Sequence, residues 1–157
     1  MVIPQEADGS PEGLSPEDAA ALANEHMRAG LAERLGIEWV AISGDRVVAR
    51  MPVEGNVQPY GILHGGATAA LCETVASVGT AVRAGADKRV TGIELNINHL
   101  RAVSAGFVTA TGTPLHLGRT TSVWDMRVED EGGRLVAVSR LTLAIRDADP
   151  APQAPTP

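Results

Sequence analysis

Apolar residues along this chain follow two periodicities, one typical of β-strands and the other of a buried helix. Two runs rich in β-branched residues, 37–43 and 46–53, are separated by a turn signal at Ser43, Gly44 and Asp45. Four further runs of this kind occupy 90–101, 106–117, 120–130 and 134–146. Because short turns separate successive runs, we predict an antiparallel sheet whose last four strands form a meander.

Between the second and third of these strands lies a long run of small and apolar residues, 65–82. Its only ionisable side chains are those of Cys72 and Glu73. No proline interrupts it and Gly85 follows it, so we predict a helix of about four to five turns. A helix that is apolar on nearly every face is usually buried on all sides. An unpaired carboxylate within such a helix is unfavourable, which makes Glu73 a candidate functional residue.

Two other interpretations of this run need to be weighed. A membrane span has a similar length, about 20 residues, but Gly, Thr and Ser occur throughout the run and Glu73 lies near its centre. A core helix whose glutamate reaches solvent explains the pattern without any function. The residues just before the helix favour a functional role.

An N-terminal helix is predicted before the first strand. Ser15 is expected to cap it, Pro16 takes the first helical position, and acidic residues follow in the first turn. The helix is expected to end near Gly36, with His26 as a surface or partly buried residue.

One domain is predicted over residues 14–146, with a flexible tail at 1–13 and a disordered, Pro-rich tail at 147–157. A chain of 157 residues is long enough to bury a core. One apolar helix and six strands predict an α+β fold in which a curved antiparallel sheet wraps around the central helix.

Composition and charge exclude several classes of function. The net charge is −6 and no cluster of Lys or Arg forms, which argues against a nucleic acid partner. A single cysteine excludes internal disulfides, and His64, His99 and His116 show no ligand spacing with a carboxylate, so no metal is expected. The N-terminus lacks the basic and apolar regions of a secretory signal, so we expect a soluble cytoplasmic protein.

Polar residues and glycines around the central helix form the candidate site: Gln58, His64, Gly65, Gly66, Glu73 and Ser77. At a helix start, backbone N–H groups lack intrahelical partners and lie at the positive end of the dipole. A carbonyl oxygen bound there is polarised, and glycine lets a ligand approach closely. The sequence His-Gly-Gly alone is a weak motif, because a sharp loop-to-helix turn explains it equally well.

The spacing of Glu73 within the helix restricts its role. Glu73 and Ser77 are four residues apart and share one face. Ser77 is a poor candidate nucleophile, since no histidine lies near it in sequence. Gly65 and Glu73 are separated by about 12 Å along a helix axis. If both act on one carbonyl, the glutamate must come from a second subunit, so a two-fold dimer would form two sites.

Cationic and hydroxyl side chains later in the chain are candidate phosphate contacts. Arg101 lies at the end of one predicted strand, and Arg119, Thr120 and Thr121 lie between the next two. A solvated strand end or a turn explains each of them equally well.

At these residues the sequence resembles hot-dog-fold acyl-CoA thioesterases of the phenylacetate-type family. The segment that carries the resemblance is QPYGILHGGATAALCETVASV, and it continues through GIELNINHLRAV, PLHLGR and DEGGRL, over roughly residues 35–146. The glutamate at 73 is similar to that of 4-hydroxybenzoyl-CoA, 1,4-dihydroxy-2-naphthoyl-CoA and enterobactin-pathway proofreading thioesterases.

The resemblance implies a role for each site residue. The Gly65 amide binds the thioester carbonyl with help from Gln58, and His64 orients that end of the site. Glu73 of the opposing subunit attacks the carbonyl or activates water, and Ser77 positions the water or the carboxylate.

The resemblance also implies a substrate and an assembly. Val78 and His99 lie near the acyl pocket, and the expected CoA contacts are Arg101, Arg119, Thr120 and Thr121. The implied substrate is an acyl-CoA with an aryl or medium-sized acyl group, or an acyl carrier protein thioester. Such enzymes have no metal or organic cofactor and are typically tetramers built from two dimers.

Two alternatives on the same fold remain. A hydroxyacyl-thioester dehydratase also places a histidine and a carboxylate at a helix start, but Glu73 lies two turns too far along the helix. An acyl-CoA-binding sensor would retain the pocket without turnover. The complete set of Gln58, His64, Glu73 and Ser77 favours catalysis.

Overall fold

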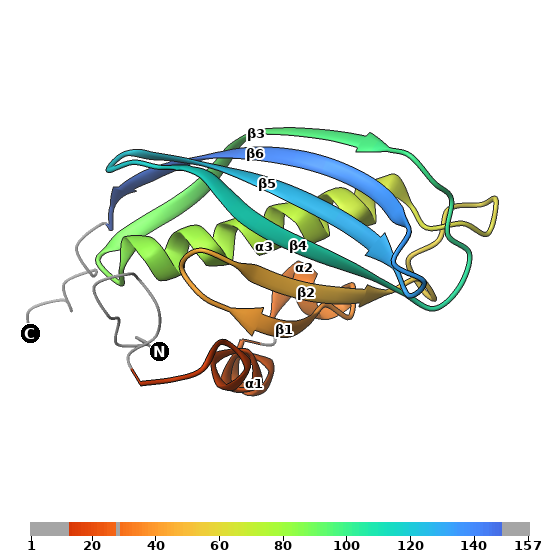
Figure 1. Cartoon of the computed structure of the whole chain (residues 1–157), viewed down its shortest axis with the longest axis horizontal. Coiled ribbons are helices and arrows are strands. Elements are labelled where there is room, and N and C mark those ends of the chain that lie inside the picture. The colour runs from red at the N-terminus through yellow and green to blue at the C-terminus, as the bar shows by residue number, and fades with distance from the viewer. Residues whose placement is uncertain (1–12, 28, 149–157) are drawn as a thin grey trace, which may run out of the picture.

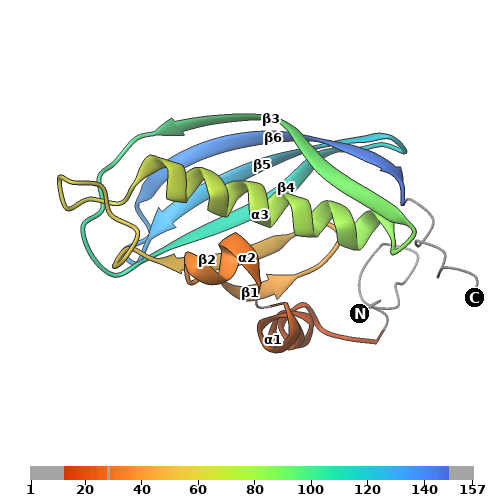
Figure 2. The same ribbon diagram turned by 180° about the vertical axis from the view of Figure 1, so that it is seen from behind.

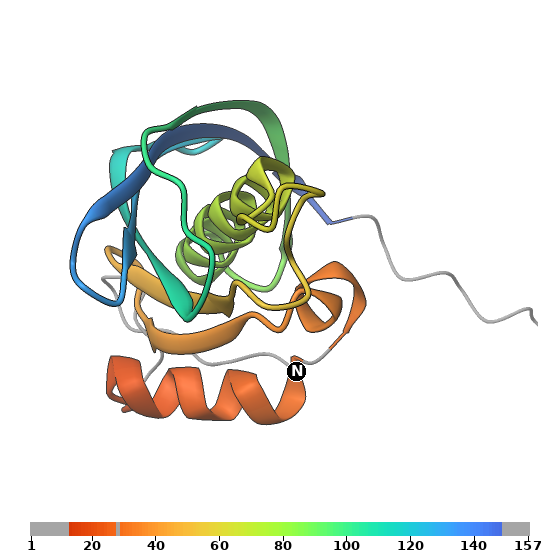
Figure 3. The ribbon, with the colours of Figure 1, turned by 90° about the vertical axis from the view of Figure 1, so that its right-hand side faces the viewer.

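The computed structural model describes residues 13–27 and 29–148, which form a curved six-stranded antiparallel sheet around one long helix. The helices are α1 (Pro16–His26), α2 (Gly30–Arg34) and α3 (Gly65–Ala84), and the strands are β1 (Glu38–Ile42), β2 (Val47–Pro52), β3 (Lys88–His99), β4 (Phe107–Leu117), β5 (Thr121–Asp130) and β6 (Leu135–Asp147). Figure 1 shows the sheet arching over α3, and Figure 3, looking along the helix, shows it enclosing α3 on one side. The predicted α+β fold is confirmed.

The predicted tails fall largely outside the described residues, which leave out 1–12 and 149–157. The last strand reaches Asp147, the first residue assigned to the C-terminal tail.

The order of the strands corrects one prediction. Strands β4, β5 and β6 form the predicted meander, but β3 does not join it through β4; it pairs with β6 at the far edge of the sheet, so the order is β1-β2-β4-β5-β6-β3. The connection from β3 to β4 therefore crosses from one edge to the interior. As a result, β2 and β4 are neighbours although α3 and β3 lie between them in sequence.

The N-terminal helix is also corrected. Ser15 caps α1 as predicted, its Oγ accepting a hydrogen bond of 3.1 Å from the Asp18 N–H. However, α1 ends at His26, and a second short helix, α2, begins at Gly30 with a φ of 66°. This left-handed conformation interrupts a helix, and glycine adopts it readily. His26 is exposed on α1.

Helix α1 buries Ala19, Ala20 and Ala23 in the core and is tied to the edge strand β1 by the side chain of Asn24. The Asn24 amide donates to the Trp39 carbonyl and its oxygen accepts from the Trp39 N–H, both at 2.8 Å. Asn24 thus supplies the bonds that a further strand would make, and it covers an otherwise open sheet edge.

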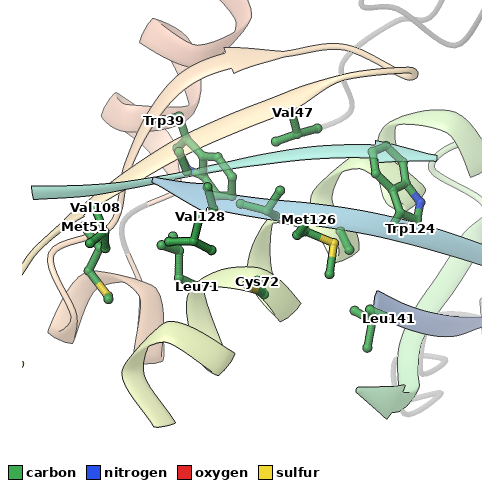
Figure 4. Packing of buried hydrophobic residues seen from close by; sticks show 14 of the residues in the cluster. Trp39, Val47, Met51, Leu71, Cys72, Val108, Trp124, Met126, Val128 and Leu141 are labelled. Carbon is green, nitrogen blue, oxygen red and sulfur yellow. The ribbon is translucent and has the colours of Figure 1, made fainter. Parts of the chain in front are cut away.

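The core lies between the concave face of the sheet and α3. Figure 4 shows Leu71 and Cys72 of α3 among side chains of β2, β4, β5 and β6. Two glycines permit this close packing: Gly79 lies directly against the Trp124 ring, and a Cβ atom at Gly112 would lie 2.7 Å from Val75 Cγ1. Deeply buried α3 residues therefore fix the rotation of this helix about its axis.

The prediction that α3 is buried on all faces is wrong for the single chain. The face that the sheet leaves uncovered carries Gly66, Glu73 and Ala81, which are exposed, and Ala70, Thr74 and Ser77, which are half-buried. Figure 2 looks onto this face of α3, below which lies α2. Among the described residues, none of the helices is long and apolar enough to cross a membrane.

Candidate active site

The loop before α3 is tied to the rest of the chain by backbone and side-chain hydrogen bonds. The Asn56 amide donates to the carbonyls of Leu35 and Pro52, at 2.8 and 2.9 Å. The His64 N–H donates to the Asn56 carbonyl, and the Leu63 N–H to that of Val103, both at 2.8 Å. The start of α3 is therefore held in a defined position.

His64 is the N-cap of α3. Its Nδ1 accepts a hydrogen bond of 2.8 Å from the Gly66 N–H. Because an accepting ring nitrogen carries no proton, neutral His64 has its proton on Nε2. A Cβ atom at Gly66 would lie 3.0 Å from Nδ1, so a side chain there would crowd the cap. His64 thus both starts the helix and offers a second N–H donor at the same end.

A cavity of about 400 Å³ lies beside the start of α3, and we name it the amide cavity. Its polar lining residues are Gln58, Gly65, Thr68, His99 and Arg101. Among the described residues, none accepts a hydrogen bond from the Gly65 N–H. This donor, at the positive end of a 20-residue helix, is suited to binding a carbonyl oxygen.

His99 lies closer to the helix start than the sequence suggests. A Cβ atom at residue 65 would lie 2.8 Å from His99 Nε2. The imidazole of His99 therefore packs directly on Gly65, and a side chain at residue 65 would displace it.

Glu73 lines a second cavity, also of about 400 Å³, which we name the carboxylate cavity. Its other lining residues are Leu31, Ala70, Thr74, Ser77 and Val78. The described part of the chain provides neither a hydrogen bond nor an ion pair for the Glu73 carboxylate, Ser77 included. The carboxylate is therefore free to act on a ligand.

The two cavities share no residue, although both lie along α3. One turn of helix rises about 5.4 Å, so the Gly65 amide and Glu73 lie about two turns apart. The structure thus brings Gln58, Gly65 and His99 together, and separately Glu73, Ser77 and Val78.

The four candidate CoA contacts also divide into two places. Arg101 lines the amide cavity, whereas Arg119 lines a cavity of about 230 Å³ at the C-terminal end of α3, together with Arg83 and Lys88. The Thr120 carbonyl accepts from the Ile145 N–H, at 2.9 Å, and from Arg146 Nη1, at 3.2 Å, and Thr121 opens β5. The two arginines of one chain therefore lie near opposite ends of a helix about 30 Å long.

Several lining residues were not identified from the sequence, among them Thr68 and Leu31. Thr68 follows Gly65 by three residues and shares its helix face, which is a signal that spacing alone could have given. Leu31 reaches the carboxylate cavity from α2, and nothing local to it indicated that contact. Within residues 13–27 and 29–148, no group of three or more His, Cys, Asp or Glu side chains could hold a metal ion.

Cys72 is a core residue, as predicted. Its side chain is fully buried in the cluster that Figure 4 shows. Burial raises the pKa of its thiol to about 12, and a hydrogen bond with Ser139 has a weaker, lowering effect.

We expect Cys72 to resist thiol reagents in the folded protein. A pKa raised from 9.0 to about 12 lowers the thiolate fraction at pH 8 by about a thousand-fold, and burial also blocks access. Titration with a coloured disulfide reagent should therefore detect no thiol until denaturant is added, and then one per chain. Rapid labelling under native conditions would contradict the buried position.

Known proteins similar to this chain share both its sequence and its fold. Residues 60–137 match the thioesterase superfamily. A 1,4-dihydroxy-2-naphthoyl-CoA hydrolase of Listeria monocytogenes is 42% identical over 74% of this chain and 96% of its own length. A proofreading thioesterase of Cronobacter turicensis is 43% identical over 73% of this chain and 85% of its own length. The crystal structure of a Haemophilus influenzae thioesterase superimposes with a TM-score of 0.78 at 36% identity, covering 92% of this chain and 99% of that one. The protein is therefore a member of the thioesterase superfamily with the hot-dog fold, and it is a thioester hydrolase.

Proposed function

We propose that this enzyme hydrolyses an acyl-CoA thioester whose acyl group is aryl or medium-sized. Water adds to the carbonyl carbon, the carbon–sulfur bond breaks, and a free acid and CoA are released. The similar protein of Listeria monocytogenes is named as the hydrolase of an aromatic acyl-CoA, which supports both parts of this proposal.

The observation that carries the proposal is the division of the catalytic groups between two cavities on one helix. An unpaired amide at Gly65 and an unpaired carboxylate at Glu73 are complementary parts of an acyl-transfer site. In one chain they lie too far apart to act on the same carbonyl carbon. A second copy of the chain resolves this separation.

Two uncovered surfaces favour a two-fold dimer. Among the described strands, β3 pairs only with β6, and it carries Ile93, whose residue surface is 62% exposed. The uncovered face of α3 consists largely of small residues, which allow a close approach of two helices. We infer that antiparallel packing of α3 on its counterpart places the partner's Glu73 carboxylate at the Gly65 amide. Such dimers would then associate as tetramers.

Within this shared site each residue has a role that its chemistry supports. The Gly65 N–H, with Gln58, stabilises the oxyanion formed from the thioester carbonyl, and His64 orients this end of the site as the cap of α3. The Glu73 carboxylate attacks the carbonyl carbon or removes a proton from the attacking water. Ser77, one turn further along, is placed to hold the water or the carboxylate.

The substrate contacts follow from the lining of the cavities. Leu31, Ala70 and Val78 give the carboxylate cavity apolar walls for an acyl group, and His99 faces the carbonyl end through its contact with Gly65. Guanidinium groups at Arg101 and Arg119 suit the phosphates of CoA. Because they lie near opposite ends of α3, we propose that one CoA contacts Arg101 of one subunit and the segment Arg119, Thr120 and Thr121 of another.

A thiol-release assay tests the proposed function. The substrates are benzoyl-, 4-hydroxybenzoyl-, phenylacetyl-, hexanoyl- and palmitoyl-CoA, and we expect the aryl and hexanoyl esters to be hydrolysed with higher kcat/KM than the palmitoyl ester. Isothermal titration with the same esters shows whether an ester that is not hydrolysed still binds. Binding without release for every ester would overturn the proposal and indicate an acyl-CoA-binding protein or a carrier-protein-linked substrate.

A further inference from the structure

We propose that Gly92 of β3 is a positioning residue for Glu73: its missing side chain provides the space in which the carboxylate lies. This inference rests on the proposed role of Glu73 and assigns a function to a strand residue that lines neither cavity.

The contact is close and specific. A Cβ atom built at residue 92 would lie 2.6 Å from Glu73 Oε1 and 3.3 Å from Glu73 Cδ. The next nearest atom, Leu141 Cδ1, would lie at 3.5 Å, an ordinary van der Waals distance. Any side chain at residue 92 would therefore collide with the carboxylate and with no other group of the core.

Backbone conformation does not account for this glycine. Its φ lies outside the left-handed region, which other glycines of the chain, such as Gly85 and Gly133, do adopt. A glycine within a strand lowers the stability of that strand, and it often marks a close approach of another group. At residue 92 that group is the carboxylate of the neighbouring helix.

The local shape of β3 supports the same conclusion. Gly92 pairs with Leu143 of β6, and the register shifts between Gly92 and Glu94, so Ile93 forms a bulge directly after the contact. Bulges bend a strand and often occur next to active sites. The bend and the missing side chain together place backbone, rather than a side chain, against Glu73.

The consequence for the reaction is that the Glu73 carboxylate can lie close to the backbone of β3. A glutamate has three rotatable side-chain bonds, and the described residues offer no hydrogen bond to hold this one. Of the two carboxylate oxygens, Oε1 lies against Gly92. Oε2 lies farther away, more than 3.5 Å from the position that a Cβ atom at residue 92 would take. The absence of a side chain at Gly92 thus lets the carboxylate lie against β3, with Oε2 left to reach a thioester carbon or a water.

Substitution of Gly92 by alanine tests this role. The side chain that must move is the flexible end of Glu73, so we expect the variant to fold, to assemble as the wild type does and to keep its thermal midpoint. A displacement of about 1 Å at a reacting group can lower the rate about a hundred-fold. We therefore expect kcat to fall about a hundred-fold with KM changed less than three-fold. Thr91→Ala, next to it on the same strand, is the matched control and should retain full activity.

Two further measurements separate positioning from a general structural effect. In a Glu73→Asp background the shorter carboxylate does not reach residue 92, so Gly92→Ala should change kcat less than about three-fold. A crystal structure of Gly92→Ala should show the Glu73 carboxylate displaced from its wild-type position. Wild-type kcat in Gly92→Ala, equal losses in both backgrounds, or an unmoved carboxylate would each overturn the inference.

Failure of this inference can be distinguished from failure of the proposed function. If Glu73→Gln abolishes thioester hydrolysis while Gly92→Ala retains it, Gly92 has no positioning role and the proposed function stands. If the wild type hydrolyses none of the CoA esters, the proposed function fails, and the crystal structure of Gly92→Ala still tests the contact.

Discussion

Replacing Glu73 with glutamine is expected to lower kcat by about 10²–10⁴-fold, the range in which a positioned acid–base group contributes to catalysis. Glutamine has the same shape but can neither attack a thioester nor accept a proton from water. KM should change little if the carboxylate acts mainly in the transition state, and single-turnover and steady-state rates with the best CoA ester measure both parameters.

The exposure of Glu73 makes this experiment decisive. Its side chain has neither a hydrogen bond nor an ion pair within the described part of the chain, so glutamine should change the free energy of unfolding by no more than about 0.5 kcal/mol. Glu54→Gln, at an exposed position after β2, is the matched control for loss of one negative charge. Undiminished kcat in Glu73→Gln would remove this residue from the mechanism.

Local signals account for most of what the sequence predicts correctly. The helix α3 begins at Gly65 and ends before Gly85, as expected, because glycines act on their immediate neighbours. The capping role of His64 was not predicted. The hairpins on either side of α3 and the six strands follow from turn residues and from runs of β-branched residues. These signals depend on few residues and are little affected by tertiary structure.

Non-local features were predicted less well. The alternation of apolar residues in β3 is the same whether it pairs with β4 or β6, so only the closure of the sheet around α3 decides its partner. The pattern of residues 16–36 fits one helix, and the left-handed conformation of Gly30 divides it. The open face of α3 was missed because small apolar residues look alike whether they pack within a chain or between chains.

In the candidate site, too, local features were predicted and contacts between distant elements were not. The short motif around His64 and Gly65 and the spacing of Glu73 and Ser77 identify the two groups of residues and their separation. Contacts between elements distant in sequence, His99 on Gly65 and Gly92 on Glu73, have no local signature. Both pair a glycine with a side chain of another element, and only coordinates reveal them.

The Gly65 amide can be removed selectively because the structure provides a matched pair of variants. Proline at the first helical position removes an N–H that has no intrahelical partner. The preceding residue, His64, already has a conformation allowed before proline, with φ −73° and ψ 129°. Gly65→Ala keeps the amide but adds the same Cβ, which displaces His99. We expect Gly65→Pro to have a kcat about 10²–10³-fold below that of Gly65→Ala, the effect of losing one oxyanion donor.

Mixing two inactive variants should then restore activity. We assume that each site takes Gly65 from one chain and Glu73 from the other. A dimer of one Glu73→Gln chain and one Gly65→Pro chain then has one site with both substitutions and one intact site. Random reassembly of equal amounts makes half of the dimers mixed, so about a quarter of wild-type activity per chain should return. Tagged chains co-purified after refolding allow the fraction of mixed dimers to be measured. If dimers shown to be mixed have no activity, Gly65 and Glu73 act within one chain and the shared site is wrong. The separation of the two cavities along α3 argues against that outcome.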